Sequence, residues 1–354
     1  MDYKFPAEIT DIEDCFLRVN VYRDSIHQDP IKMSSLLTYI KTYNKLSRDI
    51  EYDDNDDYFM NDPKRVINFI KNMPGRGGVG ISTNTQRNYF SAVIQLGQVC
   101  LLPRPLMKTY MLEREKLNKN YEKKLAKSEF EEKEKEQVPI LTQFNIREIL
   151  RDIPNRDEEV RIFLNYDGLD YRISEFDVYD KLVYWVTMWI YHFNRLRNDL
   201  CYCDMLTQVE LEVHPKRDIG SFLVQQYNGD WHILLGDWKT KRQDDDSKRL
   251  NMKGGSMING LLTKWFNANG REGPFIKNPR TNTKMSSKMF TDFMLKMNDK
   301  YLGHRIGTRM LRKIFYSEKY GDFIKTIKAD AEQNLHSVGT AMNIYTKEIP
   351  SPNV

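Results

Sequence analysis

The sequence of 354 residues predicts a multidomain α and β protein, in which a helical domain precedes a mainly α domain with a small antiparallel sheet. Three observations support this prediction. Apolar residues recur at three-to-four spacing between 32 and 108, as in amphipathic helices. A stretch rich in Lys and Glu, with almost no apolar stripe, follows at 109–137. Beyond it, two apolar runs flank Asn228-Gly229, a strong local signal for a β-hairpin.

The N-terminal third should contain an arm and a helical domain. Residues 1–31 are acidic and mixed, and we expect an N-terminal arm or a short helix there. The segment 32–108 should form three helices, the third capped by Ser82 or Thr83. The apolar faces of the first two helices are Leu36, Leu37, Ile40 and Tyr43, and Val66, Ile67, Phe69 and Ile70.

A domain boundary is expected at the charged stretch 109–137, which has the composition of a solvated helix or a linker. The second domain, 138–354, should begin with a helix capped by Thr142. Ser174, followed three residues later by Asp177, resembles a capping box ahead of a long apolar helix. The sequence therefore predicts helices at the start of the second domain.

The sheet of the second domain is predicted from a hairpin. Phe222–Tyr227 and Trp231–Leu235 are joined through Asn228-Gly229, for which a type I′ turn is expected because both central residues then need positive φ. The alternating run Val209–Val213 predicts a further strand upstream. After the hairpin, the apolar spacing returns to that of helices.

Composition excludes several classes of protein. The hydrophobic fraction of 40% and charged fraction of 29% are ordinary for a globular protein. The longest apolar stretch, Leu182–Ile190, is too short to span a bilayer, so we expect no membrane association. The N-terminus lacks the apolar run of a secretory signal, so we expect an intracellular location.

Neither a metal nor a cofactor is expected. The four cysteines include no CxxC pair, and the six histidines form no HxxxH or HxH pair. Gly75–Gly80 satisfies GxGxxG by letter, but it follows a helical pattern rather than a strand. A dinucleotide site needs the strand, and we therefore interpret this run as a connection between helices.

Charge is distributed unevenly along the chain. From Lys239 to Asp330 there are 21 Lys and Arg against 9 Asp and Glu, a local net charge of +12, whereas the whole chain carries +4. An excess of this size indicates a surface for a polyanion. A solvated basic face without a partner is the alternative.

Five residues with distinct chemistry follow one another in a telling order. Arg197 lies in a Leu-Arg-Asn-Asp run, and Lys239 begins a Lys-Thr pair just after the predicted hairpin. Arg312 lies in a basic cluster, and His336 precedes Tyr345 by nine positions. Each residue alone also has an ordinary interpretation: Arg197 could form a surface ion pair with its neighbouring aspartate, and the lysine could block a sheet edge.

This ordered set resembles the catalytic set of the tyrosine recombinase (phage-type integrase) family. The Leu-Arg-Asn-Asp and Lys-Thr motifs are similar to those of integrases from large eukaryotic DNA viruses and their virophages. The motif matches cover about residues 196–346, and the segment 32–108 is similar in placement to the family's core-binding domain. The resemblance implies the family's catalytic fold, a double-stranded DNA substrate, a homotetramer on DNA and no cofactor. It also implies a location where the target DNA lies, either the host nucleus or a cytoplasmic viral factory.

The resemblance implies a role for each residue. Tyr345 would attack phosphorus and leave a 3′-phosphotyrosyl bond. Arg197, Arg312 and His336 would stabilise the negative charge that develops on the nonbridging oxygens, and guanidinium groups suit them because they donate in pairs. Lys239 would protonate the departing 5′ oxygen.

One position departs from the family pattern. The family usually has histidine three residues before the second arginine, and here that residue is Arg309. Arginine can bind phosphate but cannot act as a base near neutral pH, so the proton acceptor for Tyr345 is unassigned. Three alternatives stay open: a type IB topoisomerase, a telomere resolvase, and a DNA-binding relative that has lost catalysis.

Overall fold

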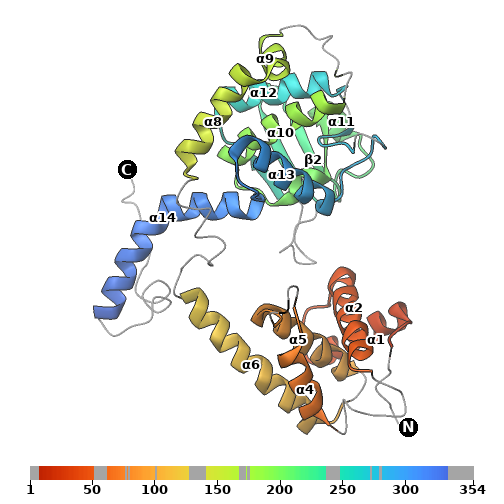
Figure 1. Ribbon diagram of the computed structural model, residues 1–354. Coiled ribbons are helices and arrows are strands. Elements are labelled where there is room, and N and C mark those ends of the chain that lie inside the picture. Colours follow the sequence, from red (N-terminus) through yellow and green to blue (C-terminus); the bar gives the residue numbers. More distant parts are fainter. Residues whose placement is uncertain are drawn as a thin grey trace, which may run out of the picture. The chain divides into compact units, whose positions relative to one another are not determined.

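The computed structural model describes residues 8–51, 62–75, 78, 80–99, 102–126, 141–166, 173, 176–236, 248–271, 273–278 and 281–333. The chain divides into two compact units, unit 1 (Met1–Glu129) and unit 2 (Phe130–Val354). The described residues are mainly helical, and unit 2 also holds a small five-stranded sheet (Figure 1).

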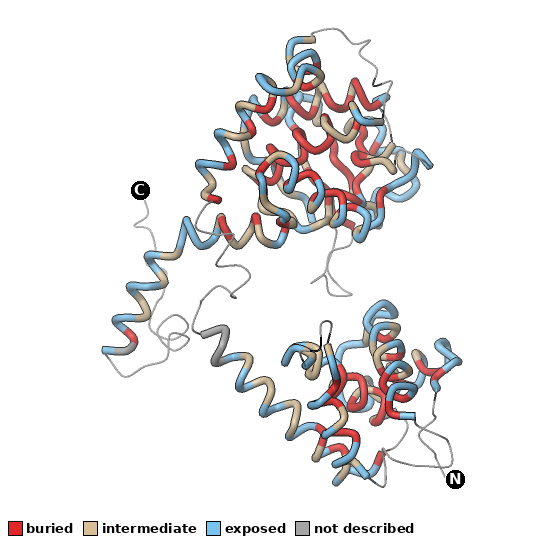
Figure 2. The backbone as a smooth tube through the Cα atoms, in the orientation of Figure 1, coloured by how far each residue is buried: buried red, intermediate tan, exposed pale blue. Residues whose placement is uncertain are grey.

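Unit 1 is a set of helices around one apolar core (Figure 2). The three predicted helices are confirmed, and their predicted apolar faces supply core residues such as Ile40, Tyr43 and Ile70. The Ser82 hydroxyl accepts a hydrogen bond from the Thr85 amide (3.2 Å), which confirms the predicted cap. The helices are α1 (Ile12–Ser25), α2 (Met33–Asp49), α4 (Pro63–Asn72), α5 (Thr83–Val99) and α6 (Arg104–Ala126).

The expected boundary at residue 108 falls inside α6. This helix packs against α4 and α5, and it buries Met107 and Tyr110 in the core of unit 1. Lys71 of α4 also forms an ion pair with Glu113 of α6 (2.6 Å). Leu117 packs against the same core, and Arg87 of α5 donates to the Asn118 side chain (2.6 Å). Residues 109–126, expected as part of a linker, therefore belong to the helical unit.

Unit 2 is organised around α10, which is buried along most of its length and packs against α8, α9 and α12. Its sequence is apolar on all sides, as expected of a helix with neighbours all round. The predicted cap of α8 is confirmed, because the Thr142 hydroxyl accepts from the Asn145 amide (3.0 Å). The capping box expected at Ser174 lies outside the described residues. The helices are α8 (Gln143–Arg156), α9 (Glu158–Asn165), α10 (Phe176–Phe193), a 3₁₀ turn η1 (Asn198–Tyr202), α11 (Gln208–Glu212), α12 (Gly255–Ala268), α13 (Ser287–Leu302) and α14 (Thr308–Gln333).

The sheet of unit 2 is mixed rather than antiparallel. Its order is β4-β3-β2-β1-β5, with β1 and β2 parallel and the other pairs antiparallel. A parallel pair needs a crossover connection, which α11 and the loop after it provide. The sheet buries its two faces in two clusters, the main core of the unit and a smaller one that includes Leu211 of α11. The strands are β1 (Cys203–Thr207), β2 (Ser221–Gln225), β3 (Trp231–Leu235), β4 (Lys248–Asn251) and β5 (Gly273–Pro274).

The predicted hairpin is confirmed as β2–β3, but its turn differs from type I′. Gly229 has a φ of 85°, whereas Asn228 is not among the described residues with positive φ. The Gly229 amide donates to the Gln226 carbonyl (2.9 Å), and the Gln226 amide donates to the Asp230 carbonyl (2.8 Å). The loop therefore has three residues, Tyr227 to Gly229, with the glycine in the left-handed conformation.

The prediction of a strand at Val209–Val213 is wrong. Most of this run forms α11, and the strand precedes it as β1. Thr207 and Glu210 form a reciprocal capping box, in which the Glu210 carboxylate accepts from the Thr207 amide (2.6 Å) and the Thr207 hydroxyl accepts from the Glu210 amide (3.3 Å). This local helix signal outweighs the alternating pattern.

Candidate active site

The first predicted arginine, Arg197, lies in the turn that joins α10 to η1. Its side chain is exposed, and its backbone is held on both sides. The buried Tyr191 hydroxyl donates to the Arg197 carbonyl, and the Arg197 amide donates to a carboxylate oxygen of Asp199 (3.2 Å). The Asp199 side chain thus orients the turn by bonding to the backbone of Arg197, rather than by forming an ion pair with the guanidinium.

Asn198, the next residue, ties this turn to two distant helices. Its side-chain nitrogen donates to the hydroxyls of Ser287 (3.1 Å) and Thr291 (2.9 Å) on α13. Its side-chain oxygen accepts from the hydroxyl of Thr308 (2.7 Å), the first residue of α14. One amide therefore fixes the start of α14 relative to the turn that carries Arg197.

The second predicted arginine, Arg312, lies on α14 within reach of this turn. Its guanidinium donates to the Leu196 carbonyl (3.3 Å), across 116 positions of sequence. Burial lowers the pKa of Arg312, and the positive charge of Arg197 lowers it further, although Tyr191 and Asp199 act in the opposite direction. The structure therefore brings Arg197 and Arg312 together, and we call them the arginine pair.

In the part of the chain that the structure describes, neither member of the arginine pair forms an ion pair with a carboxylate, although Asp199 is near enough to stabilise the charge of Arg312. Neither guanidinium lies within 4.0 Å of a carboxylate there, and the two cations repel one another. Two adjacent guanidinium groups without a bound carboxylate are suited to an anion with several oxygens, such as a phosphodiester.

Arg309 and His304 lie before Arg312 on the same stretch of chain. Arg309 is exposed on α14, three residues from Arg312 and hence on the same side of the helix. His304 is half-buried in the loop that precedes α14. Lys239, His336 and Tyr345 lie outside the described residues, so their predicted places in the site stay predictions.

Arg195 is a site residue that the sequence interpretation missed. Its guanidinium lies 3.6 Å from the ring centroid of Phe315 on α14, and it donates to the side chain of Gln143 on α8 (2.9 Å). Burial lowers its pKa to about 10.

His192 stands beside this arginine as a neutral group. Burial, together with the nearby charges of Arg195, Arg147 and Arg151, lowers its pKa to about 4. Near neutral pH this histidine is therefore uncharged. Three arginines around one histidine extend the positive surface from the arginine pair toward α8.

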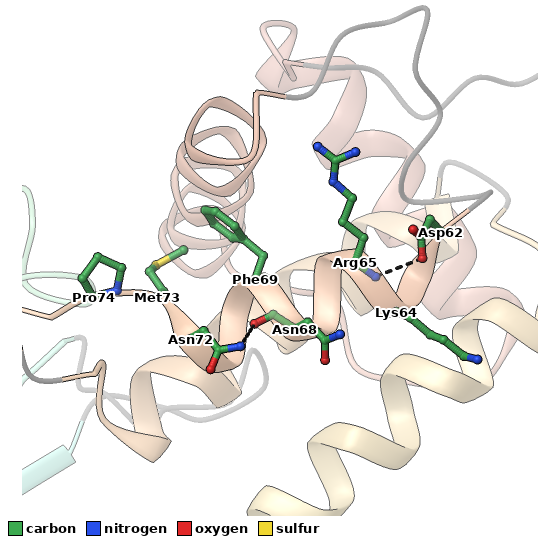
Figure 3. Close-up of a pocket in the computed structure, with 8 residues that line it drawn as sticks. All are labelled: Asp62, Lys64, Arg65, Asn68, Phe69, Asn72, Met73 and Pro74. Carbon is green, nitrogen blue, oxygen red and sulfur yellow. Dashed lines mark hydrogen bonds between the residues drawn. The ribbon is translucent and has the colours of Figure 1, made fainter.

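Unit 1 contains an open hollow along α4 (Figure 3). The Asp62 carboxylate accepts from the Arg65 amide (3.0 Å) and caps the helix, and the Asn72 side chain donates to the Asn68 carbonyl (2.9 Å). Basic and amide side chains of this kind can contact phosphate or base edges. None of the predicted catalytic residues is here. The residues that line the hollow are Asp62, Lys64, Arg65, Asn68, Phe69, Asn72, Met73 and Pro74.

Comparisons with known protein families, with curated proteins and with solved structures found no match to this chain. Among the residues described, no three His, Cys, Asp or Glu side chains gather as a metal site would require. In the same residues, every helix is either too short or too polar to cross a bilayer.

Proposed function

We propose that this chain is a site-specific DNA recombinase or integrase that cleaves and rejoins DNA through a 3′-phosphotyrosyl intermediate. The observation that carries the proposal is the arginine pair. Arg312 is hydrogen-bonded beside Arg197 although the two are far apart in sequence, and these are the two arginines expected from the motif order.

The chemistry assigns the arginine pair to the phosphate. Attack on a phosphodiester passes through a state with additional negative charge on the nonbridging oxygens. Guanidinium groups already held at that position lower the barrier without reorganisation, and they remain charged at any physiological pH. His336 would add a donor there, Tyr345 would be the nucleophile, and Lys239 would protonate the leaving 5′ oxygen. The ester energy is kept in the phosphotyrosyl bond, so the reaction needs no nucleotide cofactor.

The remaining surface is assigned to binding duplex DNA. The local charge of +12 between Lys239 and Asp330 would attract the phosphate backbone. Unit 1, with Lys64, Arg65 and Asn68 along α4, would hold the same duplex as a core-binding domain. Exchange between two duplexes needs four active sites, and the proposal therefore includes a homotetramer on DNA.

A covalent trapping experiment tests the proposal. Nicked duplexes carrying the ends of the DNA element that encodes this chain would be incubated with the full-length protein. We expect a protein–DNA adduct that survives detergent and disappears on protease treatment. Absence of any adduct, together with sequence-specific footprinting on the same ends, would favour the DNA-binding relative without catalysis, which the arginine at position 309 makes the main alternative.

A second assay separates the related enzymes. A type IB topoisomerase relaxes supercoiled plasmid without a specific site or a partner duplex. A telomere resolvase converts a specific site into closed hairpin ends. We expect neither product, and recombinant products only when two copies of the specific site are supplied.

A further inference from the structure

An exposed row of aromatic side chains leads away from the arginine pair along α14. Tyr316, Tyr320 and Phe323 follow Arg312 at intervals of four, four and three residues, so all lie on one side of the helix. Their exposed fractions are 51%, 41% and 53%. The rings of Tyr316 and Tyr320 are stacked, with centroids 6.0 Å apart and an interplanar angle of 19°. We call these two residues the tyrosine platform.

Positive groups border the tyrosine platform. The Lys319 ammonium lies 5.1 Å from the ring centroid of Tyr320 and 5.7 Å from that of Phe315. Arg195 also lies over the Phe315 ring, and the hydroxyl of Tyr316 is near enough to act electrostatically on Arg195 and Arg312. The platform is thus continuous with the site that we assign to phosphate.

Both acidic residues within this part of α14 are engaged. The Glu318 carboxylate accepts a hydrogen bond from the Gln143 amide at the start of α8 (2.7 Å) and also acts on the charge of Arg195. The Asp322 carboxylate forms an ion pair with Lys325 (3.1 Å). The positive charges beside the tyrosines favour an anionic partner over an uncharged, apolar partner.

The combination of features identifies the kind of partner. Large exposed aromatic surface in a soluble unit indicates a binding site. The centre of a protein–protein contact is depleted in lysine, whereas aromatic rings alternating with cations are typical of sites for unpaired bases and their phosphates. We propose that the tyrosine platform binds unpaired nucleobases of a single DNA strand, with Lys319 contacting its phosphates.

This inference rests on the proposed function, because the strand in question would be the one held at the arginine pair. Strand exchange requires bases next to the cleaved phosphate to leave one complement before they find another. A platform one helical turn from the arginine pair would hold those bases while they are unpaired. It would therefore stabilise the open strand without taking part in the bond changes.

The test measures equilibrium binding of the full chain to a fluorescein-labelled oligothymidylate and to the same strand containing 2-aminopurine, whose fluorescence reports stacking. Tyr316→Ala and Tyr320→Ala should each weaken binding by about tenfold, the size expected for losing one base–aromatic stack. Both variants should also reduce the change in 2-aminopurine fluorescence that accompanies binding, because the base stacks less. The corresponding phenylalanine variants keep a ring and should bind like the wild type.

Two matched variants separate stacking from charge and from exposure alone. Lys319→Ala should lower the slope of log affinity against log salt by about 0.7, as for one phosphate contact on a single strand, whereas the tyrosine variants should leave that slope unchanged. Tyr227→Ala removes another tyrosine of unit 2, 74% exposed at the β2–β3 turn, and should leave single-strand binding unchanged.

Unchanged single-strand affinity in the Tyr316→Ala/Tyr320→Ala double variant would overturn the inference. If that variant binds the single strand normally but has a different oligomeric mass in sedimentation, the aromatic row is a contact between protein chains instead. The covalent trapping assay distinguishes the two proposals. Adduct formation with unchanged single-strand affinity rejects only the platform, whereas platform-dependent affinity without any adduct rejects only the strand transferase.

Discussion

The two units differ in where their buried polar side chains lie. In unit 2, Asn298 is fully buried, accepts from the Tyr184 hydroxyl (2.9 Å) and donates to the Ile306 carbonyl just before α14 (2.7 Å). Asn194 exchanges two hydrogen bonds with the backbone of Lys253 before α12. With Asn198, these contacts surround the arginine pair.

Unit 1 has a simpler interior. Its core is apolar, and its comparable long-range amide, Asn44, exchanges hydrogen bonds with the backbone of Ile9 before the first helix (3.0 and 2.9 Å). Buried amides fix distances because each unmade hydrogen bond is costly, whereas apolar packing tolerates small shifts. We therefore expect the described part of unit 2 around α14 to be held more rigidly than unit 1.

The largest expected effect tests whether the chemistry belongs to unit 2 alone. Tyr345→Phe should abolish covalent attachment to DNA, because the hydroxyl is the proposed nucleophile, while DNA affinity in a gel-shift assay stays near that of the wild type. An adduct that persists in this variant would place the nucleophile at another tyrosine. Tyr316, the exposed tyrosine beside Arg312, would then be replaced first.

The arginine pair should give the next largest effect. Arg197→Ala or Arg312→Ala should slow cleavage by at least about a hundredfold, the usual loss when one preorganised donor to a developing oxyanion is removed. DNA affinity should fall far less. The matched change in unit 1, Lys64→Ala, should weaken binding and leave the cleavage rate of bound DNA unchanged. Equal losses of binding and cleavage for the arginine variants would show that the two arginines only contact the DNA backbone and have no catalytic role.

Lys239 and Lys241 provide a narrower test within unit 2. Lys239→Ala should be severely slowed on normal DNA and recover on a substrate with sulfur in place of the bridging 5′ oxygen, because a thiolate leaves without a proton. Lys241→Ala should cleave normally and show only weaker, more salt-sensitive binding. Sulfur rescue of the Lys241 variant alone would exchange the two assignments.

Two asparagines compare the units directly. Asn198→Ala and Asn44→Ala should each lower the free energy of unfolding by about 1–3 kcal/mol, because each leaves hydrogen-bonding groups unpaired. Only Asn198→Ala should also slow cleavage, by about tenfold, since it releases α14 from the turn that carries Arg197. All five tryptophans lie in unit 2, so their fluorescence follows its unfolding, while circular dichroism follows both units. Equal cleavage rates for the two variants would show that the hydrogen bonds of Asn198 do not position the arginine pair for cleavage.

Local signals in the sequence predicted much of the fold. The caps at Ser82 and Thr142 and the β2–β3 hairpin depend on neighbours within a few residues, and they are confirmed. Where two local signals competed, at Val209–Val213, the capping box of Thr207 outweighed the alternating pattern. The mixed sheet was not predictable, because the parallel β1–β2 pairing depends on a crossover rather than on a turn.

The sequence predicted the charged residues of the candidate site but not the hydrogen bonds that position them. Motif order singled out Arg197 and Arg312, and Arg312 donates to the carbonyl of Leu196, the residue before Arg197. Their catalytic role stays a prediction. Asn198 stood between two noted residues, yet its partners lie 89 to 110 positions away, so no spacing rule could reveal its role. Arg195 was passed over for the same reason, since its contact with Phe315 exists only once α14 is in place.

The smallest expected effect is a difference in acid sensitivity between the units. The folded-state pKa of His192 is lowered to about 4 from an ordinary value of 6.5, so the unfolded chain binds more protons between these values. Unit 2 should therefore lose stability as pH falls from about 6.5 to about 4. In unit 1, hydrogen bonds from Lys116 and Lys71 lower the pKa of Glu113 below 4.5, so that contribution is lost only at lower pH.

Thermal unfolding followed by tryptophan fluorescence at pH 7, 6, 5 and 4.5 checks this order. His192→Gln should flatten the decline of unit 2 over this range, leaving a smaller slope from His232, whose pKa burial and Arg249 also lower. Glu113→Gln should leave the fluorescence transition unchanged at every pH, because it removes a contact of unit 1 only. If unit 2 keeps its stability down to pH 4.5, the expected cost of protonating His192 beside three arginines is wrong.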